Sequence, residues 1–255
     1  MAYGDALDAG LAALGIDLAA ESRSAVDDHV RLLVAWNDAI NLTAVREPAA
    51  IAVRHVVDSL AGLDVLRARS IERFVDLGSG GGFPGLPLAA AAGARALLVD
   101  SIAKKARFLE ASVEAVGLAG RVGVAARRAE DLARDREERG RWPAVTARAV
   151  ASLADLVELA LPLLAPGGVL LAWKSGYPTD ALGLGGELSA AETALAAVGD
   201  GSITVGPAAA DVAGTRAPAV ASIADHRIVV VERGRRPIGD HWPRDPAARK
   251  RRPWS

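Results

Sequence analysis

The chain has 255 residues, about half of them hydrophobic, and a formal net charge of −1. This length allows one large domain, or one domain with a small extension. Cysteine is absent, which excludes disulfides, thiolate metal sites and a cysteine nucleophile. No apolar run reaches the roughly 18 residues of a membrane span, and the N-terminus lacks the order of a signal peptide, so we expect a cytoplasmic protein.

The first two segments with regular spacing of apolar residues are helical. They cover residues 5–15 and 20–40, and a third helix is expected to carry His55 and Asp58 three positions apart on one face. Such a pair can orient a histidine for proton transfer, but a hydrogen-bonded pair beside a helical core is its commoner use. We assign residues 1–66 to a helical extension packed on the core.

A short apolar strand ending at Leu77 runs directly into a glycine cluster and a helix start. The stretch reads FVDLGSGGGFPGLPLA. Its glycines permit positive φ and close approach of a ligand to the backbone, and the N–H groups at a helix start favour a carboxylate or phosphate. The stretch therefore predicts a ligand site, although a turn that only joins strand to helix is the alternative.

Two cofactor classes use such a turn. A dinucleotide fingerprint needs a glycine or alanine where Phe83 stands. Asp76 would also face a pyrophosphate unfavourably, whereas it could accept a hydrogen bond from an ammonium group. The pattern D-x-G-x-G, formed by Asp76, Gly78 and Gly80, resembles the first motif of S-adenosylmethionine-dependent methyltransferases. That resemblance implies a loop that holds the methionine end of the cofactor.

Strand and helix patterns alternate after the glycine turn, which is typical of parallel βαβ units. The second strand, residues 94–100, ends in Asp100 about twenty residues beyond the turn, where an acidic side chain commonly bonds ribose hydroxyls. The next helix, residues 102–117, has a basic start that opposes its dipole and suits a polyanion, or is a solvated face. Its cations are Lys104, Lys105 and Arg107.

Two further strands are expected at residues 122–125 and 144–150. Glu130 opens the helix after the first of them, where a negative charge is favourable. Residues 135–141 are a charged insert and predict a surface loop. Arg148 interrupts the apolar strand at residues 144–150 near its end. An unpaired buried charge is energetically costly, so we expect this side chain to line the ligand cleft.

The remaining pattern completes a mostly parallel sheet. We expect a strand at residues 169–174, a helix at 180–198, and an antiparallel hairpin from 219–223 and 227–232. The fold class is therefore α/β, a Rossmann-like mostly parallel sheet of seven strands with its core at residues 67–235. In such sheets the ligand binds outside the carboxyl ends of the strands.

The last twenty residues, 236–255, form a basic tail. Between residues 232 and 255 there are eight basic and three acidic side chains, with Trp242 and Trp254 among them. Cations interleaved with aromatic rings can follow an RNA backbone and stack on bases, whereas a solvated terminus is the alternative. The RNA-binding candidates here are Arg244, Arg249 and Lys250.

Five segments together resemble one family, the bacterial small-subunit ribosomal RNA guanine-N7 methyltransferases of the glucose-inhibited-division-B type. They are WNDAINLTAVREPAAIAVRHVVDSL, DLGSGGGFPGLPLA, LVDSIAKKARFLE, RAEDLA and TARAVASLADLVELALPLLAPGG. The resemblance covers nearly the whole chain and implies a class I methyltransferase fold, S-adenosylmethionine as cofactor, and 16S ribosomal RNA or the small subunit as partner. Carried over by position, the family's cofactor-binding residues fall on Gly78, Phe83, Ala129, Glu130 and Arg148.

Two features of the resemblance bear on the tail and on catalysis. Trp242-Pro243-Arg244 is similar to an aromatic-Pro-Arg element of the family, but the following residues 245–252 depart from its glycine-containing basic segment. Guanine N7 carries a free lone pair, so methylation there needs placement rather than a base or a metal. We therefore assign no catalytic base, keep Arg148 as the one candidate catalytic residue, and expect no metal, no membrane contact and a monomer.

Two other functions remain open from the sequence. One is an S-adenosylmethionine-dependent methyltransferase that acts on a small molecule or a protein. The other is a noncatalytic, cofactor-gated ribosome assembly factor. A lid that encloses the substrate would favour the first, and particle binding without methyl transfer would identify the second.

Overall fold

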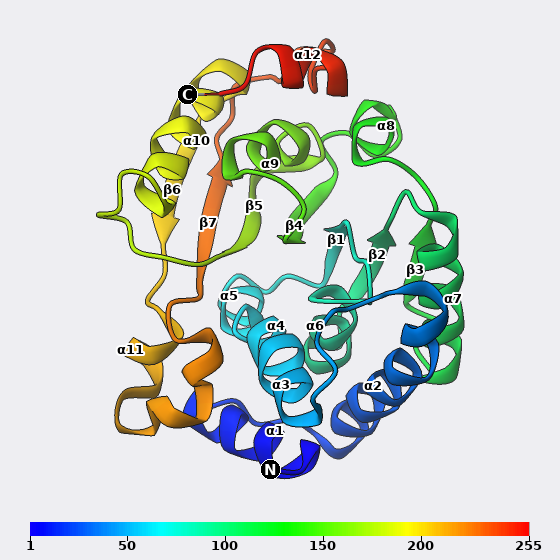
Figure 1. Cartoon of the computed structure of the whole chain (residues 1–255). Coiled ribbons are helices and arrows are strands. Elements are labelled where there is room, and N and C mark those ends of the chain that lie inside the picture. Colours follow the sequence, from blue (N-terminus) through cyan, green and yellow to red (C-terminus); the bar gives the residue numbers. More distant parts are fainter. Residues whose placement is uncertain (255) are drawn as a thin grey trace.

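The computed structural model describes residues 1–254, which form a seven-stranded sheet with helices on both faces (Figure 1). The strand order is β3-β2-β1-β4-β5-β7-β6; β7 runs antiparallel to its neighbours β5 and β6, and the other pairs are parallel. The strands are β1 (Arg73–Leu77), β2 (Arg95–Val99), β3 (Val122–Ala125), β4 (Trp142–Arg148), β5 (Leu164–Lys174), β6 (Gly201–Val205) and β7 (Arg227–Arg233). The predicted fold class is confirmed.

The central strands are buried on both faces, and each face supports its own core. Phe74 and Val75 are neighbours in β1, and both are fully buried, one in each of the two cores. This explains the continuous apolar runs in the strands, since a parallel sheet is covered on both sides. The covering helices after β1 are α6 (Gly85–Ala92), α7 (Ala103–Ala115), α8 (Ala129–Arg134), α9 (Leu153–Ala160) and α10 (Leu184–Val198).

The N-terminal helices, blue and cyan in Figure 1, lie beside α6 and α7 and share a core with them. They are α1 (Tyr3–Ala13), α2 (Ala20–Ile40), α3 (Pro48–Ile51), the π-helix η1 (Ala52–Val57), α4 (Asp58–Leu60) and α5 (Leu63–Ala68). The amphipathic spacing places Val26, Val30 and Leu33 of α2 in that core. No helix within residues 1–254 is long and apolar enough to cross a lipid bilayer.

The predicted hairpin at residues 219–223 is wrong. That segment lies in the 3₁₀-helix η2 (Gly214–Ile223), which follows α11 (Ala209–Ala213), and the antiparallel partner of β7 is β6. A short apolar run does not distinguish a strand from a buried helical turn by its periodicity. The actual partner carries the β-branched residues Ile203, Thr204 and Val205, which suit a strand.

The C-terminal segment is docked on the sheet domain rather than left in solvent. It contains α12 (Pro246–Arg251), which lies near α8 and α9 at the top of Figure 1. The insert at residues 135–141, predicted as a surface loop, is a series of turns that helps to hold this segment. Arg139 donates hydrogen bonds to the carbonyl oxygens of Trp242 and Gly239 at 2.8 and 3.1 Å.

Helix α2 supports the glycine turn through a buried histidine. The Nε2 atom of His29 lies 2.8 Å from the carbonyl oxygen of Gly81. Burial lowers the pKa of His29 to about 4, so the neutral ring donates this bond at physiological pH. Gly82 has a φ of 88°, and a Cβ atom there would lie 2.6 Å from the same Nε2 atom. The ring and the turn therefore fit against each other without room for a side chain.

We expect Gly82→Ala to destabilise the fold far more than Gly117→Ala. Both glycines have positive φ, but a Cβ atom at Gly117 would meet nothing within 4 Å. Backbone strain alone should lower the free energy of unfolding of Gly117→Ala by about 1–2 kcal/mol. The added clash with His29 should bring the loss for Gly82→Ala to about 3 kcal/mol or more. Urea unfolding followed by circular dichroism measures both; equal losses would contradict the tight fit.

Candidate cofactor-binding site

The turn after β1 presents its backbone at the carboxyl end of the sheet. Gly78 and Gly80 have φ values of 69° and 56°, which favour glycine. A Cβ atom at Gly78 would lie 2.5 Å from Cγ2 of Val150, so packing also requires glycine there. At Gly80 the nearest atom would be 3.7 Å away, and a side chain would extend into open space. That space is available to a ligand that approaches the backbone.

Asp76, in the buried strand β1, fixes this turn through hydrogen bonds of its side chain. Its side chain is fully buried; Oδ1 accepts a hydrogen bond from Thr146 Oγ1 at 2.7 Å, and Oδ2 accepts one from the backbone N–H of Gly85 at 3.2 Å. Burial raises the pKa of Asp76 to about 6, because the charged form loses its hydration. The sequence analysis expected Asp76 to accept a hydrogen bond from a ligand ammonium, whereas in the structure this carboxyl group is buried and links β1 with β4 and α6.

A cavity of about 730 Å³ opens beside the turn, at the carboxyl ends of β1, β2 and β4. Four of the predicted cofactor-binding residues line it, namely Gly78, Asp100, Ala129 and Glu130. Asp100 Oδ2 accepts a hydrogen bond from the backbone N–H of Gly80 at 3.0 Å, which joins the end of β2 to the turn. The volume lies within the range of small-molecule and cofactor sites, roughly 300–1,000 Å³.

The groups around this cavity fit S-adenosylmethionine. Open space above Gly80 admits a close ligand backbone, and Asp100 and Glu130 supply carboxylate oxygens that accept hydrogen bonds from hydroxyl or amino groups. The cofactor has ribose hydroxyls and amino groups as donors. A pyrophosphate would instead meet two carboxylates, which is unfavourable.

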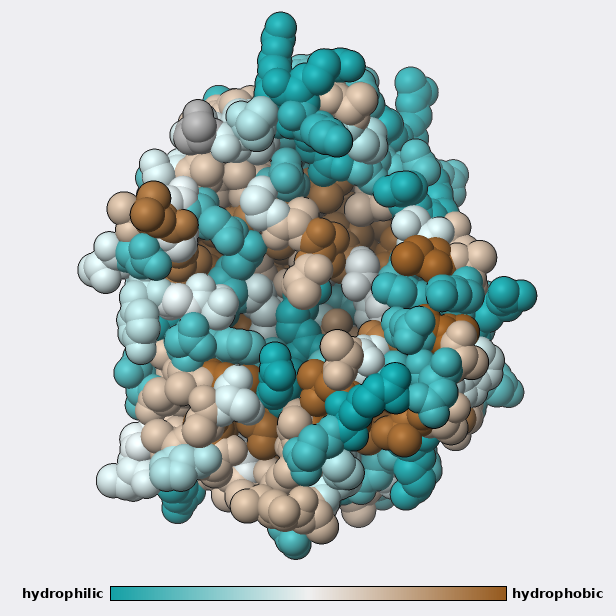
Figure 2. Space-filling view, viewed as in Figure 1, coloured by the Kyte–Doolittle hydropathy of each residue, from teal (hydrophilic) through white to brown (hydrophobic). Residues whose placement is uncertain are grey.

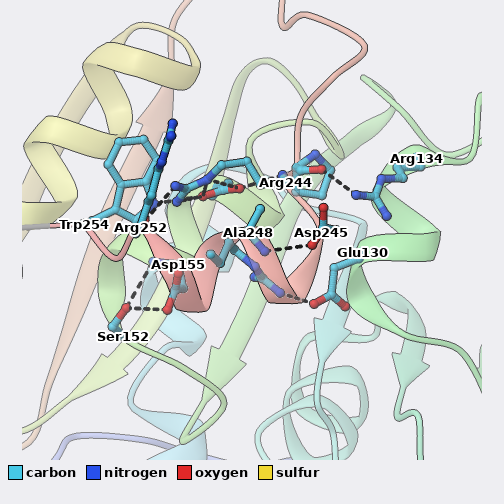
Figure 3. Close-up of polar contacts among 12 residues, drawn as sticks. Glu130, Arg134, Ser152, Asp155, Arg244, Asp245, Ala248, Arg252 and Trp254 are labelled. Carbon is cyan, nitrogen blue, oxygen red and sulfur yellow. Dashed lines mark hydrogen bonds and ion pairs between the residues drawn. The ribbon is translucent and has the colours of Figure 1, made fainter.

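Glu130 is engaged by the C-terminal segment, a contact that the sequence did not reveal. Its Oε1 atom accepts a hydrogen bond from Nη2 of Arg249, and both side chains are nearly buried (Figure 3). Pro246, Arg249 and Lys250 also line the cavity. The tail thus forms part of the wall of the predicted cofactor site.

Arg148 lies at the end of β4 and is paired with a buried carboxylate. Its Nη1 atom donates to Asp58 Oδ2 at 2.8 Å and to the carbonyl oxygen of Arg54 at 3.1 Å. Asp58 is 2% exposed, and its Oδ1 atom lies 2.9 Å from Nδ1 of His226. This hydrogen bond to Asp58 raises the pKa of His226. The partner that the lone charge of β4 required is therefore Asp58.

Phe83 packs among cationic and aromatic groups rather than along the cavity wall. Its ring stacks on His55, with centroids 5.0 Å apart, and the guanidinium carbon of Arg148 lies 5.6 Å from the ring centroid. His55 bonds to Thr43 Oγ1 at 2.7 Å, whereas Asp58 bonds to Arg148 and His226, so the expected pairing of His55 with Asp58 is not observed. Burial lowers the pKa of His55 to about 4.

The predicted RNA-binding cations differ in their exposure and in whether they are paired with a carboxylate. Lys104 and Arg107 are exposed on α7, and Lys250 is exposed on α12. Lys105 and Lys250 both line the cavity, so two cations from distant parts of the chain stand at its rim. In contrast, the guanidinium groups of Arg244 and Arg249 are bound to carboxylates of the same chain.

Glu158 is a further residue that the sequence reading passed over. It is fully buried in α9, and Arg244 Nη2 donates to its Oε2 atom at 2.6 Å. The run LADLVELALPLL contains two carboxylates, Asp155 and Glu158, and they were the available signal, because a carboxylate buried among apolar residues requires a partner. Within residues 1–254 no cluster of three or more histidine and acidic side chains has the arrangement of a metal site.

Comparison with known proteins identifies the family. A family model described as rRNA small subunit methyltransferase G, or GidB, matches residues 22–194. A protein named ribosomal RNA small subunit methyltransferase G from Rubrobacter xylanophilus is 36% identical over 244 residues, covering 95% of this chain and 88% of that protein. A protein of the same name from Stenotrophomonas maltophilia is 44% identical over 173 residues, which are 68% of this chain and 77% of the relative.

Solved structures support the fold. An O-methyltransferase from Bacillus cereus in complex with SAH has a TM-score of 0.54 at 17% identity and covers 81% of this chain and 91% of its own. An SAH-bound methyltransferase from Podospora anserina has a TM-score of 0.56 at 13% identity, with coverage of 83% and 88%. The class I methyltransferase fold and the family resemblance are thus confirmed: the chain belongs to the rRNA small subunit methyltransferase G family.

Proposed function

We propose that this protein transfers the methyl group of S-adenosylmethionine to N7 of a guanine in small-subunit (16S) ribosomal RNA. The observation that carries the proposal is the cavity beside the glycine turn, lined by Asp100 and Glu130, in a chain of this family. The nature of the substrate supports a site of action in the cytoplasm, and we propose that the protein acts as a monomer.

The reaction requires little of the protein beyond placement. When bound, S-adenosylmethionine supplies an electrophilic methyl group, and guanine N7 offers a lone pair without giving up a proton. Holding the two groups in line is therefore the main contribution of the site. N7 is an atom of the major-groove edge, so the guanine must be unpaired, extruded or reached in an open RNA structure.

We assign the cofactor to the cavity wall and the turn. The backbone at Gly78 and Gly80 and the side chains of Asp100 and Glu130 would hold it, with Ala129 at the start of α8. Asp76 and Phe83 support the same turn from the core, through the bonds and stacking described above. In this assignment the carboxylates accept hydrogen bonds and no residue acts as a base.

Arg148 does not line this cavity, and we assign it to the neighbouring position beside Phe83, where the reacting groups would meet. Its guanidinium is held by Asp58 and by Phe83, at the carboxyl end of β4. The remaining donors of a fixed planar fork suit a phosphate or a carboxylate of a ligand. The pair with Asp58 gives Arg148 a structural role as well, and the two roles call for different measurements.

The three parts of the chain receive separate roles in this proposal. Residues 1–66 form a helical extension that supports the glycine turn, as the His29 contact illustrates. Residues 67–235 are the methyltransferase core. Residues 236–255 form a basic tail that reaches the cofactor cavity through α12.

The first test is methyl transfer itself. Incubation with labelled S-adenosylmethionine and small-subunit particles, or stripped 16S RNA, should label one guanine, and mass spectrometry of nuclease fragments should locate the methyl group at N7. Asp100→Ala should lower the affinity for the cofactor at least about tenfold, or ~1.4 kcal/mol by calorimetry. Asp131→Ala, which alters an exposed carboxylate of α8, is the control. Particle binding without transfer would instead support an assembly factor.

The second test addresses RNA contact by α7. The triple substitution of Lys104, Lys105 and Arg107 to alanine should weaken RNA binding and flatten its salt dependence by roughly 2 units of slope, since each phosphate contact releases counterions. A charge-matched control replaces Arg67, Arg95 and Arg121, which lie toward the amino ends of the strands. Equal slopes for both variants in filter-binding titrations would return α7 to a solvated basic face.

The third test separates the two roles of Arg148. Arg148→Ala leaves the buried Asp58 carboxylate without this partner and should lower the free energy of unfolding by about 3–5 kcal/mol. Arg46→Ala, which removes an exposed pair with Asp38, should lower it by less than about 1 kcal/mol. Arg148→Lys should keep most of the stability yet lose much of the methyl transfer. Near-normal transfer by Arg148→Lys would defeat the geometric role.

A further inference from the structure

The C-terminal segment runs along the cofactor cavity and supplies part of its wall. Figure 3 shows α12 lying between Glu130 of α8 and the start of α9 at Ser152 and Asp155. Four residues of this segment line the cavity: Pro246, Arg249, Lys250 and Pro253. Residues at the far end of the chain thus enclose the same space as Gly78 and Asp100, which come from the glycine turn and β2.

A buried ion pair fixes this wall in place. The Glu158 side chain is fully buried and receives bonds from the backbone N–H of Arg244, its guanidinium and Trp254 Nε1, the last at 2.8 Å. The guanidinium carbon of Arg244 also lies 4.4 Å from the centroid of the Trp254 ring. Displacing the segment would remove all of these donors from the Glu158 carboxylate, which is unfavourable. The segment is therefore a built part of the fold.

Arg249 reaches from this fixed wall to Glu130. Its side chain is 12% exposed and that of Glu130 is 9% exposed. Nη2 of Arg249 binds Oε1 of Glu130, and among the described residues no hydrogen bond engages Oε2. A carboxylate held by one oxygen keeps the lone pairs of the other for a ligand donor.

The pair is poorly explained by stability alone. The Nε atom of Arg249 is buried and has no hydrogen-bond partner among residues 1–254. A buried ion pair with an unsatisfied donor contributes little to folding, because desolvation offsets the attraction. Its location in the cavity wall, on a residue that the family resemblance assigns to the cofactor, favours a role in ligand binding.

We propose that the C-terminal segment, residues 244–254, completes the cofactor site, and that Arg249 is a positioning residue that orients Glu130 toward a donor group of the bound cofactor. This proposal rests on the proposed function, since it takes the cavity as the S-adenosylmethionine site. It separates Arg249 from Arg251 and Arg252, which are exposed and free to meet a polyanion. Arg249, in contrast, is mostly buried and bound to Glu130, so it is poorly placed to meet an RNA phosphate.

The experiment is calorimetric titration of S-adenosylmethionine and S-adenosylhomocysteine into the full chain. Arg249→Met, which keeps an unbranched apolar stem and removes the guanidinium group with its charge, should weaken both ligands about tenfold or more. Arg249→Lys should recover part of the loss. Arg251→Met is the matched control from the same helix and should leave the affinity unchanged. Urea unfolding of each variant without ligand checks that the fold is kept.

A double-mutant cycle with Glu130→Gln tests whether Arg249 acts through Glu130. In the Glu130→Gln background, Arg249→Met should cause little further loss of affinity, because the group that Arg249 orients has changed. This double variant also removes both buried charges, so it remains folded and measurable if Arg249→Met alone unfolds.

Three outcomes would overturn the proposal. Affinity equal to that of the wild type for Arg249→Met, or the same loss in both backgrounds, would show that Arg249 does not position Glu130. Weaker RNA binding with unchanged cofactor binding would make Arg249 an RNA contact. Failure of the wild-type protein to bind S-adenosylmethionine at all would be a failure of the proposed function, and it is distinguishable because no variant enters that measurement.

Discussion

The buried carboxyl group of Asp76 is the constraint on which the site depends. It takes a hydrogen bond from Thr146 in β4 and one from the N–H of Gly85 at the start of α6. Two strands and a helix therefore meet at one side chain, below the turn that carries Gly78 and Gly80. Burial destabilises the charged form of Asp76, and the two hydrogen bonds offset part of that cost. Loss of either donor would leave a buried carboxyl oxygen without its partner. The same bonds fix where the turn exposes its backbone.

Much of the fold followed from local patterns in the sequence. The strand β3 coincides with its predicted bounds, β1 ends at the predicted Leu77, and β2 and β4 differ by one or two residues at their ends, whereas β5 begins at Leu164 rather than at residue 169. These elements are predictable because a buried parallel strand is a continuous apolar run between turn residues. The hairpin failed for a related reason: residues 219–223 include the apolar Val220 and Ile223, but these two side chains are buried from a 3₁₀-helix. Hydrophobicity records burial and does not by itself record backbone conformation.

The candidate site divides in the same way between local and distant contacts. Gly78, Asp100 and Ala129 follow strands in the sequence, and the carboxyl ends of parallel strands share one edge of the sheet, so their meeting was predictable. The hydrogen-bonded pairs that join distant segments of the chain were not predictable from the sequence. Asp58 meets His226 across 168 positions, and Glu130 meets Arg249 across 119. Such contacts leave no periodic signature, and only an isolated charge within an apolar run indicates that a partner exists.

The docking of the C-terminal segment has a consequence for the order in which the protein becomes complete. Synthesis proceeds from the N-terminus, so the sheet and α9 emerge before residues 244–254. Until Arg244 arrives, the Glu158 carboxylate of α9 has none of its guanidinium contacts. Until Arg249 arrives, the cavity beside the glycine turn lacks one side. The proposed cofactor site is therefore the last part of this fold to be completed during synthesis, and it closes only after residues 244–254 have left the exit tunnel.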